Sequence, residues 1–399
     1  MAQTTSRPTS NSARLWISGL GSQYPPYLLT PERLDNLANR FFDVENPGLK
    51  KLLQISRSTG IQTRSAISAY ESGFGTQVDP PTISDIDRIF RKAGVDLTVQ
   101  ACKKALREWG GEYLDITHTI GVTCTNSSNP GYDLLVNQKL GLASTVDRNL
   151  LHGVGCAGGL AIMRAAAQIA SGASMRGKPA RVLAFACELC TPNFRCDLAV
   201  AAKCADPSAV SISGALFSDG AAAFVLCNEL GLGIETQPIF ELLEWGSATL
   251  PSTTQYMSFY VDPQGFQTTL TRDVPALAVP AILPMFQSLL PEVKKTTGNE
   301  DLETVDFDWA LHPGGEAIID GAKELLSLNE DQLRATREIY RTRGNSSSPT
   351  VLIVLDRLRN MGRGREQIVA TSFGPGLAIE MSIFKRYRDE TEDSDNGDP

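Results

Sequence analysis

His152-Gly-Val-Gly-Cys156-Ala-Gly-Gly-Leu160-Ala-Ile-Met-Arg-Ala-Ala-Ala-Gln-Ile-Ala170 is the stretch of sequence around which the chain is best understood. From Leu160 onward it consists mainly of strong helix formers, which predicts a helix with Cys156 at or just before its N-terminus. Unpaired backbone N–H groups and the helix dipole favour a thiolate at that position. The surrounding glycines allow a bulky thioester to reach the sulfur. A small, buried and inert cysteine beside a tightly packed helix is the alternative interpretation of this stretch alone.

A second stretch repeats the pattern of the first. His312-Pro-Gly-Gly-Glu-Ala-Ile-Ile-Asp-Gly matches Cys156-Ala-Gly-Gly-Leu-Ala-Ile-Met-Arg-Ala at both glycines and at the Ala-Ile pair. Phe217 follows Cys156 by 61 residues, just as Phe373 follows His312. The repeat predicts an internal duplication with an offset of 156 residues. Two facing halves would then bring a thiol and an imidazole together, which is the arrangement of an activated nucleophile.

The composition of the 399 residues is that of a globular protein large enough to bury an extensive core. Six acidic residues after position 388 account for most of the net charge of −8, so the body of the chain is close to neutral and gives no signal for nucleic acid. The N-terminus lacks the apolar segment of a signal peptide, and no run of about 18 apolar residues indicates a membrane span. We therefore expect neither a nucleic-acid nor a membrane partner.

Eight cysteines are scattered along the chain without the density of a disulfide-stapled secreted domain, which favours a reducing cytoplasmic location. Cys187-x-x-Cys190, with Cys196 and Cys204 close behind, raises the alternative of a zinc site. A zinc site needs converging ligands from a turn-rich segment, whereas Cys187 lies in an apolar strand pattern. We expect buried thiols and no metal.

Strand and helix patterns alternate along the chain in the manner of an α/β protein. A buried strand at 118–125, a helix at 131–140, the Cys156 helix and a strand at 181–187 form a right-handed parallel unit. The helical run at 274–293 holds four prolines and is therefore expected to be kinked or broken. Further strands are predicted at 221–227, 239–245, 367–372 and 377–384.

The chain has only three histidines, so few candidates exist for a catalytic base. His118 lies within a strand pattern and is expected to be a core residue. His152 precedes Cys156 by four residues and is a weaker candidate for contact with it. His312, which takes the place of the cysteine in the second stretch, is the preferred partner of Cys156.

Four motifs together resemble the signatures of type III polyketide synthases, the chalcone synthase superfamily. They are Gly155-Cys156-Ala-Gly-Gly, Leu311-His312-Pro-Gly-Gly, Gly344-Asn345-Ser-Ser-Ser and Phe373-Gly-Pro-Gly-Leu-Ala-Ile-Glu. The resemblance extends from about residue 14 to residue 386. The Arg57-Ser-Thr-Gly-Ile-Gln-Thr-Arg64 segment and a shortened loop at 126–131 look most like those of fungal alkylpyrone and alkylresorcinol synthases.

This resemblance implies an α/β fold of the thiolase-like αβαβα layered type, built from two pseudo-symmetric halves and assembled as an obligate homodimer. It divides the chain into a flexible N-terminal tail at 1–13, a half carrying the nucleophilic cysteine at 14–232, a half carrying histidine and asparagine at 233–387, and an acidic disordered tail at 388–399.

The resemblance also implies a catalytic triad. Cys156 is the nucleophile, His312 keeps it as a thiolate and donates to the thioester carbonyl, and Asn345 is the second donor. An imidazolium partner and a helix end would both lower the thiol pKa. His312 and Asn345 together would form an oxyanion hole that also stabilises an enolate.

Other family positions map onto the walls of a substrate cavity. Phe217 matches the phenylalanine that gates the CoA tunnel, and a second gatekeeper position falls on Thr268, so that either Phe266 supplies the ring or the mouth is wider. Cavity-lining positions fall on Asn126, Ser127, Asn193, Ser213 and Ser347. The candidates for CoA binding are Arg57 and Arg64, near Lys50 and Lys51, for the phosphates, and the backbone of Gly314 and Gly315 for the pantetheine arm.

The implied reaction loads an acyl group from acyl-CoA onto Cys156 and extends it with malonyl-CoA by repeated decarboxylative condensation. The chain then cyclises to an alkyl-α-pyrone or a related product. The reaction requires no metal, flavin or nicotinamide cofactor, because CoA arrives with the substrates. The alternatives are a ketoacyl-ACP synthase of fatty-acid synthesis, a thiolase, for which a second cysteine is missing at 366–384, and an inactive binding protein of the same fold.

Overall fold

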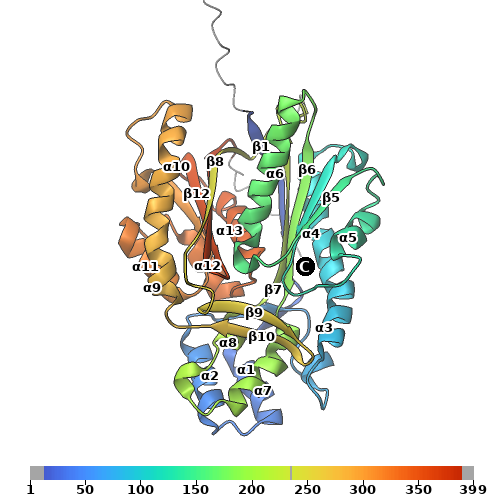
Figure 1. The fold of residues 1–399 in the computed structure, drawn as a ribbon, viewed down its shortest axis with the longest axis vertical. Helices are drawn as coiled ribbons and strands as arrows, with labels where there is room; N and C mark the ends of the chain where they lie inside the picture. The colour runs from blue at the N-terminus through green and yellow to red at the C-terminus, as the bar shows by residue number, and fades with distance from the viewer. Residues whose placement is uncertain (1–12, 234–235, 389–399) are drawn as a thin grey trace, which may run out of the picture.

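The computed structural model describes residues 13–233 and 236–388. The predicted tails, 1–13 and 388–399, therefore lie almost wholly outside the described residues. Within that range the chain forms one mixed sheet of nine strands covered by helices on both faces (Figure 1). The strands in the order of the sheet are β11 (Phe307–Leu311), β12 (Gln367–Gly374), β13 (Ala378–Arg386), β8 (Phe240–Thr249), β1 (Leu15–Gln23), β7 (Asp219–Asn228), β6 (Arg181–Leu189), β4 (His118–Val122) and β5 (Asp147–Leu151).

The two halves of this sheet repeat one pattern of strand directions. In the first half, β1 pairs antiparallel with β7, β7 antiparallel with β6, and β6 parallel with β4. In the second half, β8 pairs antiparallel with β13, β13 antiparallel with β12, and β12 parallel with β11. The halves meet where β1 pairs antiparallel with β8. The predicted pseudo-symmetric architecture is confirmed, while the exact boundary between 14–232 and 233–387 stays a prediction.

The predicted register of the duplication is wrong at its main pair. Cys156 lies on the turn that enters α6 (Gly158–Met175), and this helix leads into β6. His312 directly follows β11, whose counterpart in the sheet is β4. The matching glycines serve different purposes, because a Cβ on Gly159 would lie 2.5 Å from the Ser348 carbonyl oxygen, whereas one on Gly315 would meet nothing within 4 Å. A shared glycine pattern thus does not establish equivalent positions.

Two helices form the middle layer of the molecule. These are α6 and α13 (Thr350–Arg359), and their buried side chains share one apolar core with strands of both halves. Outer helices cover the other faces, so the strands are buried on both sides and consist of nearly continuous apolar runs. The outer helices are α3 (Ile83–Ile89), α4 (Val95–Trp109) and α5 (Tyr132–Leu140) on the first half, and α9 (Val274–Ala278), α10 (Ile282–Thr297), α11 (Glu316–Leu326) and α12 (Arg334–Arg343) on the second. This layering is the predicted thiolase-like fold (Figure 1).

The proline-rich run of the second half is broken as predicted. It forms α9, a 3₁₀ turn at Val279–Ala281 and α10, with Pro291 inside the last helix. By length and composition alone, Val274–Thr297 is the one candidate among the described residues for a membrane-crossing helix. Its buried side, which includes Ile282 and Phe286, packs into the apolar core of the second half. That packing is typical of the outer helix of a layered domain.

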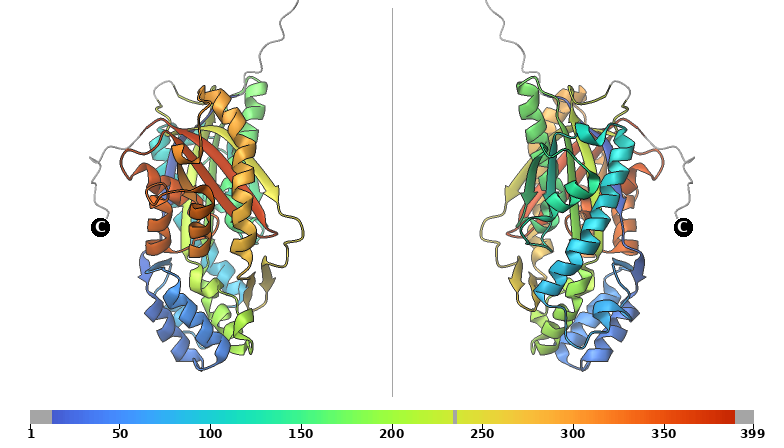
Figure 2. Two further views of the ribbon diagram at one scale, coloured as in Figure 1. Left: turned by 90° about the vertical axis from the view of Figure 1, so that its left-hand side faces the viewer. Right: turned by 90° about the vertical axis from the view of Figure 1, so that its right-hand side faces the viewer.

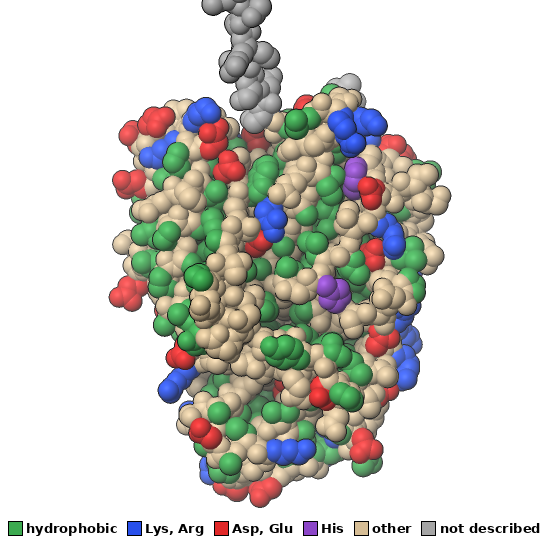
Figure 3. All heavy atoms as spheres, in the orientation of Figure 1, with side chains coloured by type: hydrophobic (Ala, Val, Ile, Leu, Met, Phe, Trp, Pro, Cys, Tyr) green, Lys and Arg blue, Asp and Glu red, His purple; other side chains and the backbone are tan. Residues whose placement is uncertain are grey.

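A separate group of small elements closes one end of the sheet. It consists of α1 (Pro31–Phe41), α2 (Pro47–Ser58), α7 (Phe194–Lys203), α8 (Ser213–Leu216), the strand pair β2 (Tyr27–Leu29) and β3 (Arg64–Ala66), and the hairpin of β9 (Met257–Asp262) and β10 (Gly265–Leu270). The helices share their own apolar core and lie beneath the sheet in both side views (Figure 2). On the face drawn in Figure 3, acidic and basic side chains are interspersed and no basic stripe crosses the surface.

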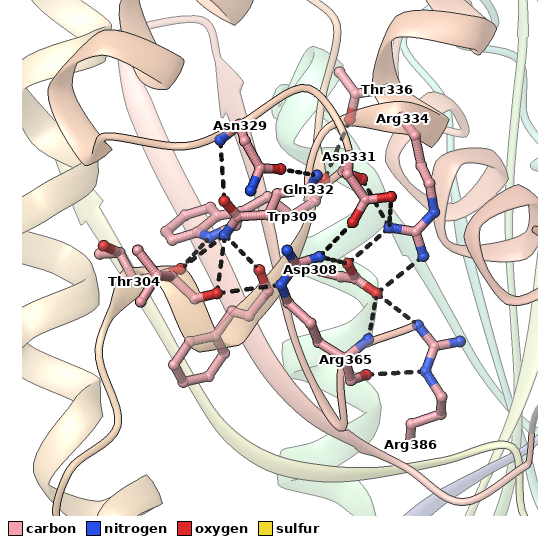
Figure 4. Close-up of polar contacts among 12 residues, drawn as sticks. Thr304, Asp308, Trp309, Asn329, Asp331, Gln332, Arg334, Thr336, Arg365 and Arg386 are labelled. Carbon is pink, nitrogen blue, oxygen red and sulfur yellow. Dashed lines mark hydrogen bonds and ion pairs between the residues drawn. The ribbon is translucent and has the colours of Figure 1, made fainter. Parts of the chain in front are cut away.

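The start of β11, at the end of the strand remote from His312, is anchored by a buried carboxylate (Figure 4). Asp308 accepts hydrogen bonds from Arg334 at 2.8 and 3.1 Å and from the guanidinium of Arg365 at 3.0 Å. Arg386 adds a third contact at 3.0 Å. Burial acts to raise the pKa of Asp308, but the bonds and charges of the arginines outweigh it and hold this pKa below its ordinary value.

Candidate active site

Cys156 lies in a single 3₁₀ turn, Gly155–Ala157, that runs directly into α6. The predicted position at a helix N-terminus is confirmed. Gly155 has a φ of +48°, and a Cβ there would approach the Pro375 ring to 2.6 Å, so this turn requires glycine. Cys156 is only 7% exposed. The turn therefore presents the sulfur to a closed space inside the protein.

The segment between α12 and α13 lies against the sulfur. Ser347 places its Oγ 3.3 Å from the Cys156 Sγ, and a side-chain hydrogen bond from Asn345 also acts on the thiol. The Asn345 Oδ1 accepts from the backbone N–H of Ser347 at 2.8 Å, which leaves the amide Nδ2 as the donor. Ser347 has a φ of +60°, an unusual conformation for a side-chain-bearing residue and one that clusters at functional sites.

His312 reaches the same end of the sheet from the second half. Its backbone N–H donates to the Thr371 carbonyl of β12 at 2.8 Å. The end of β12 packs on the cysteine turn, where a Cβ on Gly374 would lie 2.3 Å from the Val154 carbonyl oxygen. The imidazole is buried, and neither Nδ1 nor Nε2 has a hydrogen-bond partner among the described residues. Buried polar atoms without partners are rare in proteins, and a catalytic role is one explanation for them.

The charge state of the pair differs from the sequence prediction of a thiolate with an imidazolium. Burial raises the pKa of Cys156 to about 12, although hydrogen bonds from Ser347 and Asn345 act to lower it. Burial lowers the pKa of His312 to about 3. Desolvation disfavours both charged forms, and no hydrogen bond joins the imidazole to the thiol. At neutral pH the structure thus holds a thiol and a neutral imidazole.

A narrow cavity with a free volume of about 50 Å³ opens beside the sulfur. Five of the seven predicted cavity residues line it: Asn193, Ser213, Phe217, Thr268 and Ser347. The rest of its wall consists of Cys124, Thr125, Gly155, Cys156, Cys190, Phe194, Asp197, Met257, Ser258, Phe259, Leu270 and Pro375.

Asn126 and Ser127 do not line this cavity, and the prediction for them is wrong. Asn126 turns away and donates to the Asp87 Oδ1 at 2.6 Å, while Ser127 is exposed. The chain turns here because the buried carboxylate of Glu188 accepts backbone N–H groups from Cys124 and Thr125 at 3.0 Å each. Cys124 and Thr125 therefore occupy the wall instead.

At the second gatekeeper position, Phe266 does not supply the ring, while the wider mouth stays a prediction. Phe266 is buried and stacks on Phe259 with a ring separation of 4.5 Å, and only Phe259 reaches the cavity. Phe259 pairs with Thr268 across the β9–β10 hairpin. The aromatic ring thus comes from the strand opposite Thr268, a position that sequence reasoning missed because cross-strand register was not known.

Of the candidates for CoA binding, Arg64 is buried, whereas Arg57, Gly314 and Gly315 are at least partly exposed. Arg64 is 2% exposed, donates to the Gly214 carbonyl at 2.5 Å and lies 4.7 Å from the centre of the Phe194 ring, so its assignment to CoA phosphates is wrong. Arg57 is exposed and pairs with Asp35 at 2.8 Å. The backbone of Gly314 and Gly315 is partly exposed next to His312. Lys50 and Lys51 lie exposed on α2.

The remaining sequence candidates lie apart from this chemistry. His118 is half-buried and shares a hydrogen bond of 2.8 Å with Thr117, and His152 is exposed. Cys187 lies inside β6, and all eight cysteines are free thiols. Among the described residues, no group of three or more His, Cys, Asp or Glu side chains is placed to hold a metal.

Glu188 was missed by the sequence analysis, although it is the one charged residue in an otherwise apolar strand after Arg181. It is fully buried and accepts hydrogen bonds from Thr125 at 2.7 Å and from Ser348 at 2.6 Å. Burial raises its pKa, against the effect of these bonds. Glu188 thus ties the loop after β4 to the segment that carries Asn345 and Ser347.

Two family models match this chain. The model of the N-terminal domain of chalcone and stilbene synthases matches residues 11–229, and the model of their C-terminal domain matches residues 242–387. A type III polyketide synthase, PspB of Penicillium soppii, is 64% identical over 383 residues, which cover 93% of this chain and 96% of that protein. The acylalkylpyrone synthase CsyB of Aspergillus oryzae is 33% identical and covers 93% of this chain and 94% of its own length.

Solved structures show the same similarity. A type III pentaketide synthase from Neurospora crassa superimposes with a TM-score of 0.90 at 39% identity, over 93% of this chain and 99% of that chain. CsyB complexed with CoA-SH superimposes with a TM-score of 0.88 at 33% identity, over 93% of this chain and 100% of that chain. The similarity therefore extends over both halves of the sheet and over the elements around Cys156.

Proposed function

The chain belongs to the chalcone and stilbene synthase family of type III polyketide synthases, and from this premise we propose that Cys156 carries the growing polyketide inside the cavity described above. The protein is a transferase that joins acyl units by iterative Claisen condensation. The alternative of a ketoacyl-ACP synthase is not supported by these relatives. The observation that carries the proposal for Cys156 is its sulfur, buried at a helix N-terminus beside Asn345 and on the wall of the cavity.

Loading begins when the thioester of an acyl-CoA enters the cavity. The Cys156 thiol passes its proton to the His312 imidazole, and the sulfur attacks the thioester carbonyl carbon. CoA leaves as its thiol after it takes up the proton. The pair is neutral at rest, so charge separates only when substrate is present, as in other nucleophiles activated by an adjacent base.

Two donors, one from Asn345 beside the sulfur and one from the unpartnered imidazole of His312, are proposed to stabilise the reaction. The Asn345 Nδ2 and one ring N–H of His312 bind the thioester oxygen as negative charge develops on it. The same two donors then bind the thioester oxygen of malonyl-CoA. When that substrate loses CO₂, they stabilise the enolate, whose carbon attacks the acyl group on Cys156. One oxyanion site thus serves both steps.

The walls of the cavity favour an alkyl starter. Phe194, Phe217, Met257, Phe259 and Leu270 form an apolar surface around the sulfur. We propose that a fatty acyl-type group from acyl-CoA is extended by malonyl-CoA here and released as an alkyl-α-pyrone or a related ring. The relative named an acylalkylpyrone synthase supports this product class.

CoA is proposed to approach along the surface next to Arg57, Gly314 and Gly315. Arg57 is an exposed guanidinium on α2 with one partner, Asp35, which a phosphate would replace. The relative with bound CoA-SH supports a CoA site in this fold. We further propose that the protein works as a homodimer, needs no cofactor beyond the CoA of its substrates, and acts in the cytoplasm.

The test is to incubate the pure protein with malonyl-CoA and acyl-CoA starters of graded length and to measure the product masses. We expect masses that equal the acyl group of the starter plus a whole number of two-carbon ketide units, each of which is malonyl-CoA after the loss of CoA and CO₂. The Cys156→Ala variant is the control and should make no such product. Product formation by this variant would contradict the assignment of the nucleophile.

A further inference from the structure

One carboxyl group lies on the wall of the cavity beside Cys156. It belongs to Asp197, in the first turn of α7, and it is the only acidic side chain among the described residues that line this space. The condensation proposed above does not use it. A carboxyl group in a largely apolar cavity requires a partner, since it is otherwise costly to bury.

The contacts of Asp197 leave one of its two oxygens available. The Ser213 Oγ donates to Oδ1 at 3.0 Å, and the Asn193 Nδ2 lies 3.4 Å from the same atom. Oδ2 accepts no hydrogen bond from the part of the chain that the structure describes. Asn193 is itself fixed, since it accepts the backbone N–H of Phe266 at 2.7 Å and donates to its carbonyl at 3.0 Å. The carboxyl is therefore held in place through Oδ1, and Oδ2 is free to bind a ligand.

The surroundings place the pKa of this carboxyl close to neutral pH. Burial raises the pKa of Asp197 to about 7, although hydrogen bonds from Ser213 and Asn193 and the charge of Arg64 act against the rise. Arg64, from β3, is the charged group that faces it. Its guanidinium donates to the Gly214 carbonyl and acts on Asp197 through its charge without a hydrogen bond to it among the described residues.

The other titratable groups on the cavity wall are the thiols of Cys124, Cys156 and Cys190, and Cys196 is the neighbour of Asp197 in α7. Burial raises the pKa of each of these four thiols, so they are uncharged near neutral pH. The facing residues of α8 and β10 on the cavity wall, Ser213, Thr268 and Leu270, do not titrate. Behind the wall, the buried carboxyls of Asp219, whose pKa burial raises to about 6, and of Glu188, whose pKa is also raised, act on Cys190. Asp197 is thus the group on the wall itself whose charge changes near neutral pH, and the Asp197→Asn variant separates its titration from that of Asp219 and Glu188.

The ligand that suits this group follows from the chemistry of the growing chain. An alkyl starter carries no oxygen beyond its thioester, whereas each extension adds one carbonyl. A protonated carboxyl donates a hydrogen bond to a ketone oxygen, and a carboxylate accepts one from an enol hydroxyl. Oxygen binding on this wall therefore distinguishes an extended chain from an unextended one.

We propose that Asp197, positioned by Ser213, binds a keto or enol oxygen of the extended chain and thereby sets how many extensions precede release. This inference rests on the proposed function, since it requires a chain on Cys156. Asp197 is a specificity-determining residue in this account and takes no part in loading or decarboxylation.

The test compares Asp197→Asn, which keeps the shape and hydrogen bonding but never ionises, with Asp197→Leu, which removes the polar group. Asp79→Asn, at an exposed position, is the matched control. Wild-type and variant proteins receive malonyl-CoA and one acyl-CoA between pH 6 and pH 8.5, and the ratio of longer to shorter products is measured by mass spectrometry. Acyl loading on Cys156 is measured in parallel.

We expect Asp197→Leu to shift the ratio at least threefold toward shorter products while loading stays within twofold of wild type. The wild-type ratio should change with pH around neutrality, and the Asp197→Asn ratio should not. If Asp197→Leu fails to fold, the inference is tested by comparing the product ratios of wild type and Asp197→Asn across the pH range. The inference is overturned if both folded variants load normally and give the wild-type product ratio at every pH. If only Asp197→Asn folds, the same result in that variant overturns it. Failure of the wild-type protein to load Cys156 overturns it together with the proposed function.

Discussion

Each end of strand β11 carries a buried polar side chain, and the two side chains differ in their hydrogen-bond partners. Near its start, Asp308 is fully buried and bonded to three arginines from three other segments of the chain. Just past its end, four residues later, His312 is as deeply buried but has no partner for either ring nitrogen. One end is satisfied within the protein, and the other has no hydrogen-bond partner among the described residues.

This difference indicates that Asp308 serves the stability of the fold, whereas His312 serves its function. The carboxylate at the start ties together β11, α12 and the strands β12 and β13 through charged hydrogen bonds, so its removal is expected to affect folding. The imidazole past the end destabilises the resting protein, because a buried polar group without a partner is unfavourable. Such local violations of packing rules are typical of active sites.

The largest effect is expected from the catalytic end. We expect His312→Gln to lower the rate of polyketide formation by about 10³-fold, because it removes the proton acceptor and one oxyanion donor. The melting temperature should change by about 2 °C or less, since the imidazole makes no hydrogen bond that the substitution would remove. Steady-state assays and thermal melts of the same samples measure both quantities. A melting temperature that falls by about 10 °C would contradict the assignment of His312 to function.

The next effect belongs to the opposite end. We expect Asp308→Asn to lower the free energy of unfolding by about 3–5 kcal/mol, because three arginines then lose their buried counter-charge. Activity per folded molecule should remain that of wild type. Asp331→Asn is the control, since Asp331 is 66% exposed in its pairing with Arg365 and should contribute less than about 1 kcal/mol. Denaturant unfolding curves measure the difference. Equal losses in the two variants would contradict the account of Asp308.

The pH dependence of stability should separate the two ends further. The folded pKa of His312 lies below its ordinary value, so its contribution is present above about pH 6.5 and is lost as the pH falls toward about 3. The folded pKa of Asp308 is also lowered, so its contribution is lost only as the pH falls below about 4. We therefore expect His312→Gln to abolish part of the loss between about pH 6.5 and pH 3 and to leave the loss below about pH 3 unchanged. A wild-type profile in this variant would contradict the assignment.

The smallest effect concerns the residue next to the sulfur. The Ser347 hydroxyl, 3.3 Å from Sγ, acts to lower the pKa of Cys156. We expect Ser347→Ala to raise this pKa further and to slow alkylation of Cys156 by iodoacetamide several-fold near pH 8. The measurement is the rate of alkylation against pH, followed by mass spectrometry of the Cys156 peptide. Unchanged rates would show that the hydroxyl does not stabilise the thiolate.

Local signals in the sequence predicted the fold class and the position of Cys156. Helix formers after a glycine-rich turn placed the thiol at a helix end, and the apolar runs of the strands indicated a sheet covered on both faces. These features depend on neighbouring residues only. The place of Asn345 beside the cysteine followed from the resemblance of its motif to the polyketide synthase signatures and not from a local pattern.

The errors arose where the answer depends on distant parts of the chain. Arg64 was a phosphate candidate because it belongs to a basic segment, but it lies buried against a carbonyl of α8 and a ring of α7. Phe259 reaches the cavity only through its register with Thr268. The anchor at Asp308 joins residues up to 78 positions apart, which no local pattern reveals. The unpartnered state of His312 also depends on the whole fold.

The account depends most directly on which sulfur takes the acyl group. Three thiols, those of Cys124, Cys156 and Cys190, line the same cavity. The measurement is peptide mass spectrometry of the wild-type protein quenched in acid shortly after mixing with an acyl-CoA and no malonyl-CoA. The account predicts a single acyl group on the Cys156 peptide and none on the other two. An acyl group on Cys124 or Cys190, or none on Cys156, would contradict it.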